Sequence, residues 1–151
     1  MSPRLRQAEP ADHKRVADIL IQTRSEFMPY APPVHSEQEV RAWVENTLLP
    51  AGGTTVAEVD GCVAAVMAVS VRDGIGWVEQ MAVAPELVGQ GIGANLIKHA
   101  LAVLPLPIRL YTFQQNVGAR RFYERHGFRA LEFTDGRTNE ERCPDVLYEM
   151  K

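Results

Sequence analysis

Three glycines at alternate positions, Gly89, Gly91 and Gly93, separate a stretch typical of a β-strand from one typical of an α-helix. Glycine adopts positive φ angles readily and lets a ligand approach the backbone closely. The unpaired N–H groups in the first turn of a helix, together with the helix dipole, favour an anion at that end. The turn therefore predicts a binding site for a ligand that carries phosphate groups.

Two better-known phosphate-binding motifs fit this turn less well. A P-loop needs Lys and Ser or Thr after its last glycine, and neither follows here. Residues 89–94 do match the Gly-x-Gly-x-x-Ala dinucleotide pattern. That pattern normally opens its domain and needs an acid about 20 residues further on to bind a ribose. Residues 109–114 contain no acid, and three predicted antiparallel strands precede the turn, so a dinucleotide site is the weaker alternative.

A second group of spaced residues follows the turn, from Asn116 through Ala119, Phe122 and Tyr123 to the pair at 127–128. It resembles the second motif of the GNAT superfamily of acetyl-coenzyme A-dependent N-acetyltransferases, Asn-x-x-Ala-x-x-Phe-Tyr-x-x-x-Gly-Phe. Residues 83–93 are similar to the pyrophosphate loop of the same family, usually Arg/Gln-x-x-Gly-x-Gly/Ala. Val88 stands where the family usually has Arg or Gln. Because such loops bind mainly through backbone N–H groups, which valine still supplies, we expect the cofactor site to be retained.

The resemblance implies an α/β (α+β) GNAT fold. This is a mixed, mostly antiparallel sheet of about six to seven strands, with helices on both faces and a splay between the two central parallel strands. The pantetheine arm of coenzyme A would lie in the splay like an added strand, bonded by the main chain of Met81 and Val83. Asn116 would hold the same arm through its amide. The implied contacts to acetyl-coenzyme A or coenzyme A are Met81, Ala82, Val83, Val88, Gly89, Gln90, Gly91, Ile92, Gly93, Ala94, Asn116 and Tyr123.

The implied activity is an acyltransferase reaction, in which a primary amine attacks the acetyl thioester directly. No activated nucleophile accompanies the motifs, so a covalent enzyme intermediate is not expected. Tyr123 would lie near the cofactor sulfur as general acid, because a phenol with a reference pKa of about 10 stays protonated at neutral pH. The plainer alternative is that Phe122 and Tyr123 only pack in the core. A coenzyme A-binding sensor without turnover is the alternative function.

The acceptor amine requires a base, because an amine with a pKa near 10.4 is neutral in only about one molecule in 2,500 at pH 7. Glu79 is the main candidate. Strand alternation predicts that it lies on the same side of its strand as Met81 and Val83. His35, with a reference pKa near 6.5, and a chain of water molecules stay open as alternatives.

The loop between the first two helices contributes to the acceptor site in this family. The candidate acceptor-binding residues are therefore Phe27, Tyr30, His35 and Trp77. A small amine, an amino acid, an aminoglycoside-like drug and a protein N-terminus all remain open as acceptors. We predict no metal site, since Cys62 and Cys143 show no metal-ligand spacing.

The elements that must position these residues can be read from hydrophobic periodicity and turn signals. Asp12 is a plausible N-cap for a first helix that should end before Pro29, and a capping box at Ser36–Glu39 should open a second helix. Asp60-Gly61 and Asp73-Gly74 predict hairpin turns. A helix should follow the glycine turn and end at Pro105, and one capped by Asn116 should close at Gly127. The predicted strands are 4–8, 54–59, 62–71, 75–83, 108–113, 128–134 and 146–150, with 108–113 returning parallel to 75–83.

The composition is that of an ordinary globular protein, and we expect residues 1–151 to form a single domain. A net charge of −3 gives no drive toward nucleic acid or anionic membrane, and no apolar run of 18 or more residues predicts a membrane span. The N-terminus lacks the apolar core of a signal peptide. Two isolated cysteines favour the reducing cytoplasm. The choice between monomer and homodimer stays open.

Overall fold

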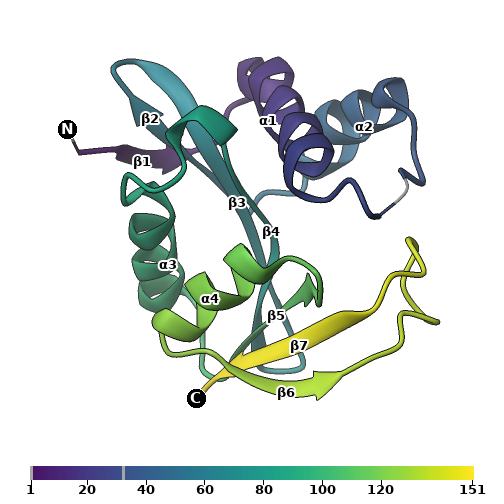
Figure 1. Cartoon of the computed structure of the whole chain (residues 1–151). Helices are drawn as coiled ribbons and strands as arrows, with labels where there is room; N and C mark the ends of the chain where they lie inside the picture. The colour runs from purple at the N-terminus through teal and green to yellow at the C-terminus, as the bar shows by residue number, and fades with distance from the viewer. Residues whose placement is uncertain (1, 32) are drawn as a thin grey trace.

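The computed structural model describes residues 2–31 and 33–151, and in this part of the chain seven strands form one sheet (Figure 1). The strands run in the order β1-β2-β3-β4-β5-β7-β6. All neighbours are antiparallel except β4 and β5, which are parallel. The bounds are β1 (Arg4–Gln7), β2 (Thr54–Val59), β3 (Cys62–Arg72), β4 (Ile75–Val83), β5 (Ile108–Phe113), β6 (Arg129–Phe133) and β7 (Asp145–Met150). The predicted mixed, mostly antiparallel sheet is confirmed.

Within the described residues, four α-helices cover the two faces of the sheet: α1 (His13–Phe27), α2 (Glu37–Trp43), α3 (Ile92–Val103) and α4 (Val117–Arg125). On one face, Val16 and Ile19 of α1 are buried against Val66 of β3. On the other, Leu96 and Ile97 of α3 are buried in a cluster that includes β3, β4 and β5 and is flanked by the aromatic residues of α4. Figure 1 shows the two pairs of helices on opposite sides of the strands. None of these helices is long and apolar enough to span a membrane.

Local sequence signals set most of the element ends. Ser36 accepts a hydrogen bond from Glu39 N at 3.1 Å, and Glu39 Oε1 accepts one from Ser36 N at 2.8 Å, so the predicted capping box is present. Asp60 and Asp73 have positive φ angles of 53° and 52° in the two predicted hairpin turns. The second helix continues beyond α2 as a π-helical turn, Val44–Leu48, before the chain turns toward β2. Strand ends differ from prediction by a residue, with β6 shorter at both ends and β7 one residue longer.

Strands β4 and β5 are paired at only two positions, Gly76↔Ile108 and Trp77↔Arg109. Beyond them β4 continues to Val83 and β5 to Phe113 without pairing to each other. The predicted splay between the two central parallel strands is therefore present. It leaves part of each strand with backbone groups that have no partner strand.

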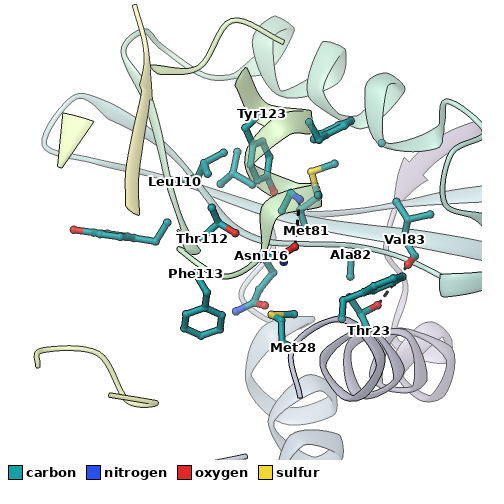
Figure 2. A pocket seen from close by; sticks show the side chains of 18 of the residues that line it. Thr23, Met28, Met81, Ala82, Val83, Leu110, Thr112, Phe113, Asn116 and Tyr123 are labelled. Carbon is teal, nitrogen blue, oxygen red and sulfur yellow. Dashed lines mark hydrogen bonds between the residues drawn. The ribbon is translucent and has the colours of Figure 1, made fainter. Parts of the chain in front are cut away.

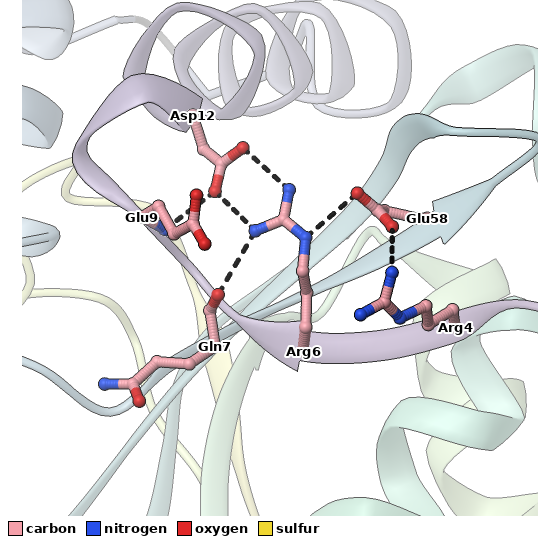
Figure 3. Close-up of polar contacts among 6 residues, drawn as sticks. All are labelled: Arg4, Arg6, Gln7, Glu9, Asp12 and Glu58. Atoms are coloured by element: carbon pink, nitrogen blue, oxygen red, sulfur yellow. Dashed lines mark hydrogen bonds and ion pairs between the residues drawn. The ribbon is translucent and has the colours of Figure 1, made fainter.

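Arg6 ties the first strand to its surroundings (Figure 3). Its Nε donates to Glu58 Oε2 at 2.9 Å, and Nη1 and Nη2 donate to the two carboxylate oxygens of Asp12 at 2.8 and 2.9 Å. Asp12 also accepts from Glu9 N at 2.7 Å, so its side chain does not cap α1 as predicted. The bond from Arg6 is the main cause that holds the pKa of Asp12 below its ordinary value of 3.8. The network joins β1, β2 and the start of α1.

We predict that Asp12→Asn lowers the free energy of unfolding at pH 7 by about 1–2 kcal/mol, the range for hydrogen bonds to charged groups. Because the pKa of Asp12 is lower in the folded chain than in the unfolded one, its contribution is present above pH 3.8 and is lost as the pH falls through the folded value. Urea unfolding at several pH values should show the difference between wild type and variant shrinking below pH 4. A difference that stays constant down to pH 3 contradicts the linkage.

Candidate active site

A cleft of about 890 Å³ opens between the splayed ends of β4 and β5. Figure 2 shows the side chains that line it. One part is lined by the glycine turn, the start of α3 and the inner face of α4, and the other by the end of α1 and the segment between β6 and β7. Every predicted cofactor residue lines this cleft except Gln90, and both predicted catalytic residues, Glu79 and Tyr123, also line it. The structure thus brings the two sequence motifs to one place.

The main chain of β4 faces the cleft at alternate residues. Ala84 N donates to Ala64 O at 2.8 Å, and the register pairs Ala82 with Val66. In an antiparallel pair, backbone groups alternate between facing the partner strand and facing away. The N–H and C=O groups of Met81 and Val83 therefore point into the splay, where an extended ligand could pair with them as an added strand. Ala82 lines the cleft, but its backbone groups are turned to β3.

The three glycines of the turn meet two different requirements. Gly89 and Gly91 have φ angles of 88° and 86°, and a Cβ at either would meet nothing within 4 Å. Their backbone conformation is what favours glycine. Gly93 is already helical, and a Cβ there would lie 3.1 Å from the Phe122 ring. The third glycine therefore lets α3 pack closely against α4.

The start of α3 has open hydrogen-bonding capacity. Gly91 is its N-cap residue, in the left-handed conformation, and no side chain caps the helix within the described residues. The first N–H groups of a helix have no partner inside it. The N–H groups of Ile92, Gly93 and Ala94 are thus available to an anion at this end of the cleft.

The side-chain amide of Asn116 caps α4 through its oxygen and leaves its nitrogen directed to other partners. Its Oδ1 accepts from Ala119 N at 3.2 Å and caps α4. None of the residues that the structure describes accepts a hydrogen bond from its Nδ2. The N-cap role was predicted, and the same contact leaves the Nδ2 group free to donate to a ligand in the cleft.

Tyr123 lies among aromatic rings on the wall of the cleft. Its ring centroid is 5.3 Å from that of Phe122, 5.8 Å from Phe128 and 6.3 Å from Tyr148. Burial raises the pKa of Tyr123 to about 12. Its hydroxyl group makes no hydrogen bond within residues 2–31 and 33–151, so a fully protonated donor faces the cleft at neutral pH.

Glu79 does not share a face with Met81 and Val83, so that prediction from alternation is wrong. The register passes from Ala68↔Gln80 to Val69↔Val78, which makes Glu79 the extra residue of a β-bulge. As a result Val78 and Met81, three residues apart, both face the α3 side. The Oε1 atom of Glu79 accepts from Ser70 Oγ at 2.7 Å and lies 2.9 Å from Arg72 Nη2, on the side covered by α1.

Of the four predicted acceptor residues, only Phe27 lines the cleft. Tyr30 packs edge-on against Phe113, a cleft residue, with 6.1 Å between ring centroids. Trp77 stacks on Tyr111, another cleft residue, at 5.9 Å, because its position is still paired to β5 below the splay. His35 is exposed, 3.4 Å from Glu140 and 3.9 Å from Glu39.

Sequence reasoning missed Arg24, which lines the cleft from α1. Glu141 lines it from the segment between β6 and β7, in the charged loop 135–142 that the sequence suggested could shape acceptor entry. They form an ion pair with Nη2 and Oε2 2.8 Å apart. The two residues are 117 positions apart in the chain, so no local pattern could have joined them. Sequence reasoning also did not name the cleft wall formed by β5, where Leu110, Thr112 and Phe113 line the cleft beyond the last paired position.

Comparisons with known proteins agree with this fold. The chain aligns over its full length with solved structures at low identity. Apo YjaB of Escherichia coli has a TM-score of 0.80 and 19% identity, with 99% of this chain and 97% of that one covered. The PaiA N-acetyltransferase of Thermoplasma acidophilum, in complex with coenzyme A, has a TM-score of 0.79 and 20% identity, with 100% and 99% covered. Arabidopsis thaliana Naa50, in complex with the bisubstrate analogue CoA-Ac-MVNAL, has a TM-score of 0.72 and 17% identity, with 100% and 99% covered.

No curated protein sequence matches the chain. The model of the acetyltransferase (GNAT) family does match it, over residues 20–128, a span that holds β4, the glycine turn and the Asn116 motif. Most of the chain, including the cleft-lining motifs, therefore falls within the family match, and the protein belongs to the GNAT acetyltransferase family.

Proposed function

We propose that this protein transfers the acetyl group of acetyl-coenzyme A to a primary amine by direct attack. The observation that carries the proposal is the convergence in one cleft of three features: the main chain of Met81 and Val83, which has no partner strand on the β5 side, the uncapped start of α3 and the free hydroxyl of Tyr123. The carbonyl of Val83 accepts only a long hydrogen bond from Thr23 Oγ1, at 3.4 Å. These are the groups that a pantetheine arm, a pyrophosphate and a leaving thiolate require.

The fit of coenzyme A follows from the donors and their order along the cleft. The N–H groups at the start of α3 would bind the pyrophosphate, and the adjacent main chain of β4 would pair with the pantetheine amides. The Nδ2 of Asn116 would donate to the same arm. The coenzyme A complex of PaiA and the bisubstrate complex of Naa50 support this placement, because both have the same fold.

In the reaction the amine nitrogen attacks the thioester carbonyl, a C–N bond forms and the C–S bond breaks. Tyr123 donates a hydrogen bond to the departing sulfur. Since the pKa of Tyr123 is about 12 and that of an ordinary thiol is about 8.5, the tyrosine keeps its proton and stabilises the departing thiolate as a hydrogen-bond donor.

Glu79 is the base that the geometry favours, directly or through a water. It lines the cleft, whereas His35 does not. The contacts from Ser70 and Arg72 both go to Oε1, which fixes the carboxylate and leaves Oε2 toward solvent or substrate. Its side of the sheet is the one covered by α1, so the acceptor would approach from that side. The free thiols of Cys62 and Cys143 favour a reducing, cytoplasmic setting for the reaction.

The proposal is tested by incubating the protein with acetyl-coenzyme A and a panel of amines and measuring release of the coenzyme thiol. We expect release that depends on both the protein and an amine. The exposed Cys62 gives a constant background, removed by Cys62→Ser. A rise in melting temperature with coenzyme A but no release with any amine contradicts acetyl transfer and favours a coenzyme A-binding sensor.

We predict that Tyr123→Phe lowers kcat about 100-fold, within the usual range for general acid catalysis, with little change in coenzyme A binding. The variant loses the hydroxyl but keeps the ring that packs against Phe122 and Phe128. Steady-state kinetics and calorimetric titration with coenzyme A give the two readouts. Undiminished kcat would refute the acid role.

We predict that Glu79→Gln lowers kcat/KM at least about 100-fold, whereas His35→Asn leaves it nearly unchanged. Glutamine keeps the shape and can still accept from Ser70, so the loss reports the missing base. Glu86→Gln is a matched control, because Glu86 is an exposed acid near the glycine turn that does not line the cleft. If His35→Asn is the inactive variant, the assignment of the base is reversed.

A further inference from the structure

A guanidinium group in the cleft has only part of its hydrogen bonds satisfied. Arg24 lies in the last turn of α1, and its Nη2 donates to Glu141 Oε2 at 2.8 Å. The other terminal nitrogen, Nη1, is buried and has no hydrogen-bond partner among the described residues. A buried charged donor without an acceptor costs free energy. Nη1 of Arg24 could therefore donate to an anionic or carbonyl oxygen of a ligand.

Arg24 lies in the part of the cleft that the coenzyme would not fill. The glycine turn, α3 and α4 line the part assigned to coenzyme A. Arg24 lies over the ring of Phe113, with Cζ 5.8 Å from the ring centroid, at the far end of β5. Tyr30 packs against the same ring, and its hydroxyl is a second buried donor without a partner in the described chain. The two donors without a partner, Arg24 Nη1 and the Tyr30 hydroxyl, therefore belong to side chains that pack on Phe113. This is the part of the cleft assigned to the acceptor amine.

The acids that line the cleft are, by contrast, mostly satisfied by the chain itself. Asp145 accepts from Thr134 Oγ1 and from Asn139 Nδ2. Glu79 accepts from Ser70 and pairs with Arg72. Glu141 is held by Arg24. An acidic wall alone would suggest a cationic acceptor, but the unmet hydrogen bonds belong to donors, which favours an acceptor with a negative group.

We propose that the acceptor is an amine that also carries a carboxylate, a small amino acid, and that its carboxylate replaces Glu141 on Arg24. This inference rests on the acetyl transfer proposed above. A carboxylate can accept from two nitrogens of one guanidinium at once, whereas Glu141 reaches only Nη2. Glu141 therefore occupies the position on Arg24 that the substrate carboxylate would take, and competes with it.

The exchange requires the segment that carries Glu141 to move away from Arg24, because Nη1 is buried. In residues 2–31 and 33–151, only two ion pairs join that segment to α1 and to the segment between α1 and α2: Arg24–Glu141 and His35–Glu140. The second is between exposed side chains and is weak. The contact that the substrate replaces is therefore the main polar link that holds the segment against α1.

The test compares two variants with opposite expected effects on KM, Arg24→Gln and Glu141→Gln. Glu140→Gln is the matched control. Each is assayed at saturating acetyl-coenzyme A with α- and ω-amino acids and with the corresponding amides, which keep the amine and lose the carboxylate. Arg24→Gln should raise KM for the acids at least about tenfold and change KM for the amides little. Glu141→Gln should lower KM for the acids by about threefold or more, because it removes the competing carboxylate and leaves Arg24 unpaired. Glu140→Gln should do neither.

Melting temperatures show whether each variant folds, and Arg24→Lys, which keeps the charge but loses the planar fork, should give an intermediate KM. A different result would be that KM changes equally for the amino acids and the amides, and in the same direction in Arg24→Gln and Glu141→Gln. The ion pair would then only hold the segment in place, and the inference would be overturned. Preference for diamines over amino acids would overturn it too. In both cases acetyl transfer stands. Absence of thiol release with every amine is the separate result that contradicts the transfer itself.

Discussion

The parting of β4 from β5 is the constraint on which the rest of the site depends. After two paired positions the strands separate, and the main chain of Met81 and Val83 is left without a partner strand. Unpaired backbone groups inside a sheet are costly unless a ligand or water satisfies them. Each face of the sheet is covered by its own pair of helices, whose apolar residues are buried against the strands. The same feature that weakens the sheet is what allows it to receive an extended ligand.

The two faces of the sheet contribute different groups to the cleft. The glycine turn and α4 approach the splay from one side, where Gly93 permits the contact of α3 with Phe122. The bulge at Glu79 turns a carboxylate to the other side, where α1 brings Arg24 and Phe27 to the cleft. In the proposed reaction, one face would thus supply the donors for the coenzyme and the acid for the leaving group, and the other would supply the base and the acceptor contacts. Attack from the α1 side is the arrangement that these placements favour.

Much of this was predictable from sequence because it is encoded locally. The capping box at Ser36, the Asp-Gly turns, the glycine turn and the cap at Asn116 each act within a few residues. The bulge was not predictable, since alternation gives no signal of an extra residue until the partner strand is placed. The side-chain roles of Asp12 and the Arg24–Glu141 contact were missed for a related reason. The side chain of Asp12 binds Arg6, which also binds Glu58 on the neighbouring strand. Glu141 contacts Arg24 only once the two ends of the chain pack together in the fold.

The central claim is that coenzyme A fills the splay and pairs with the main chain of β4. Backbone amide NMR during titration with coenzyme A tests it most directly. The account predicts large shifts for the N–H resonances of Met81, Val83 and residues 92–94. It predicts smaller shifts for Ala82 and Ala84, whose N–H groups point toward β3. Binding that leaves Met81 and Val83 unchanged, or that perturbs Ala82 and Ala84 as strongly, would contradict it.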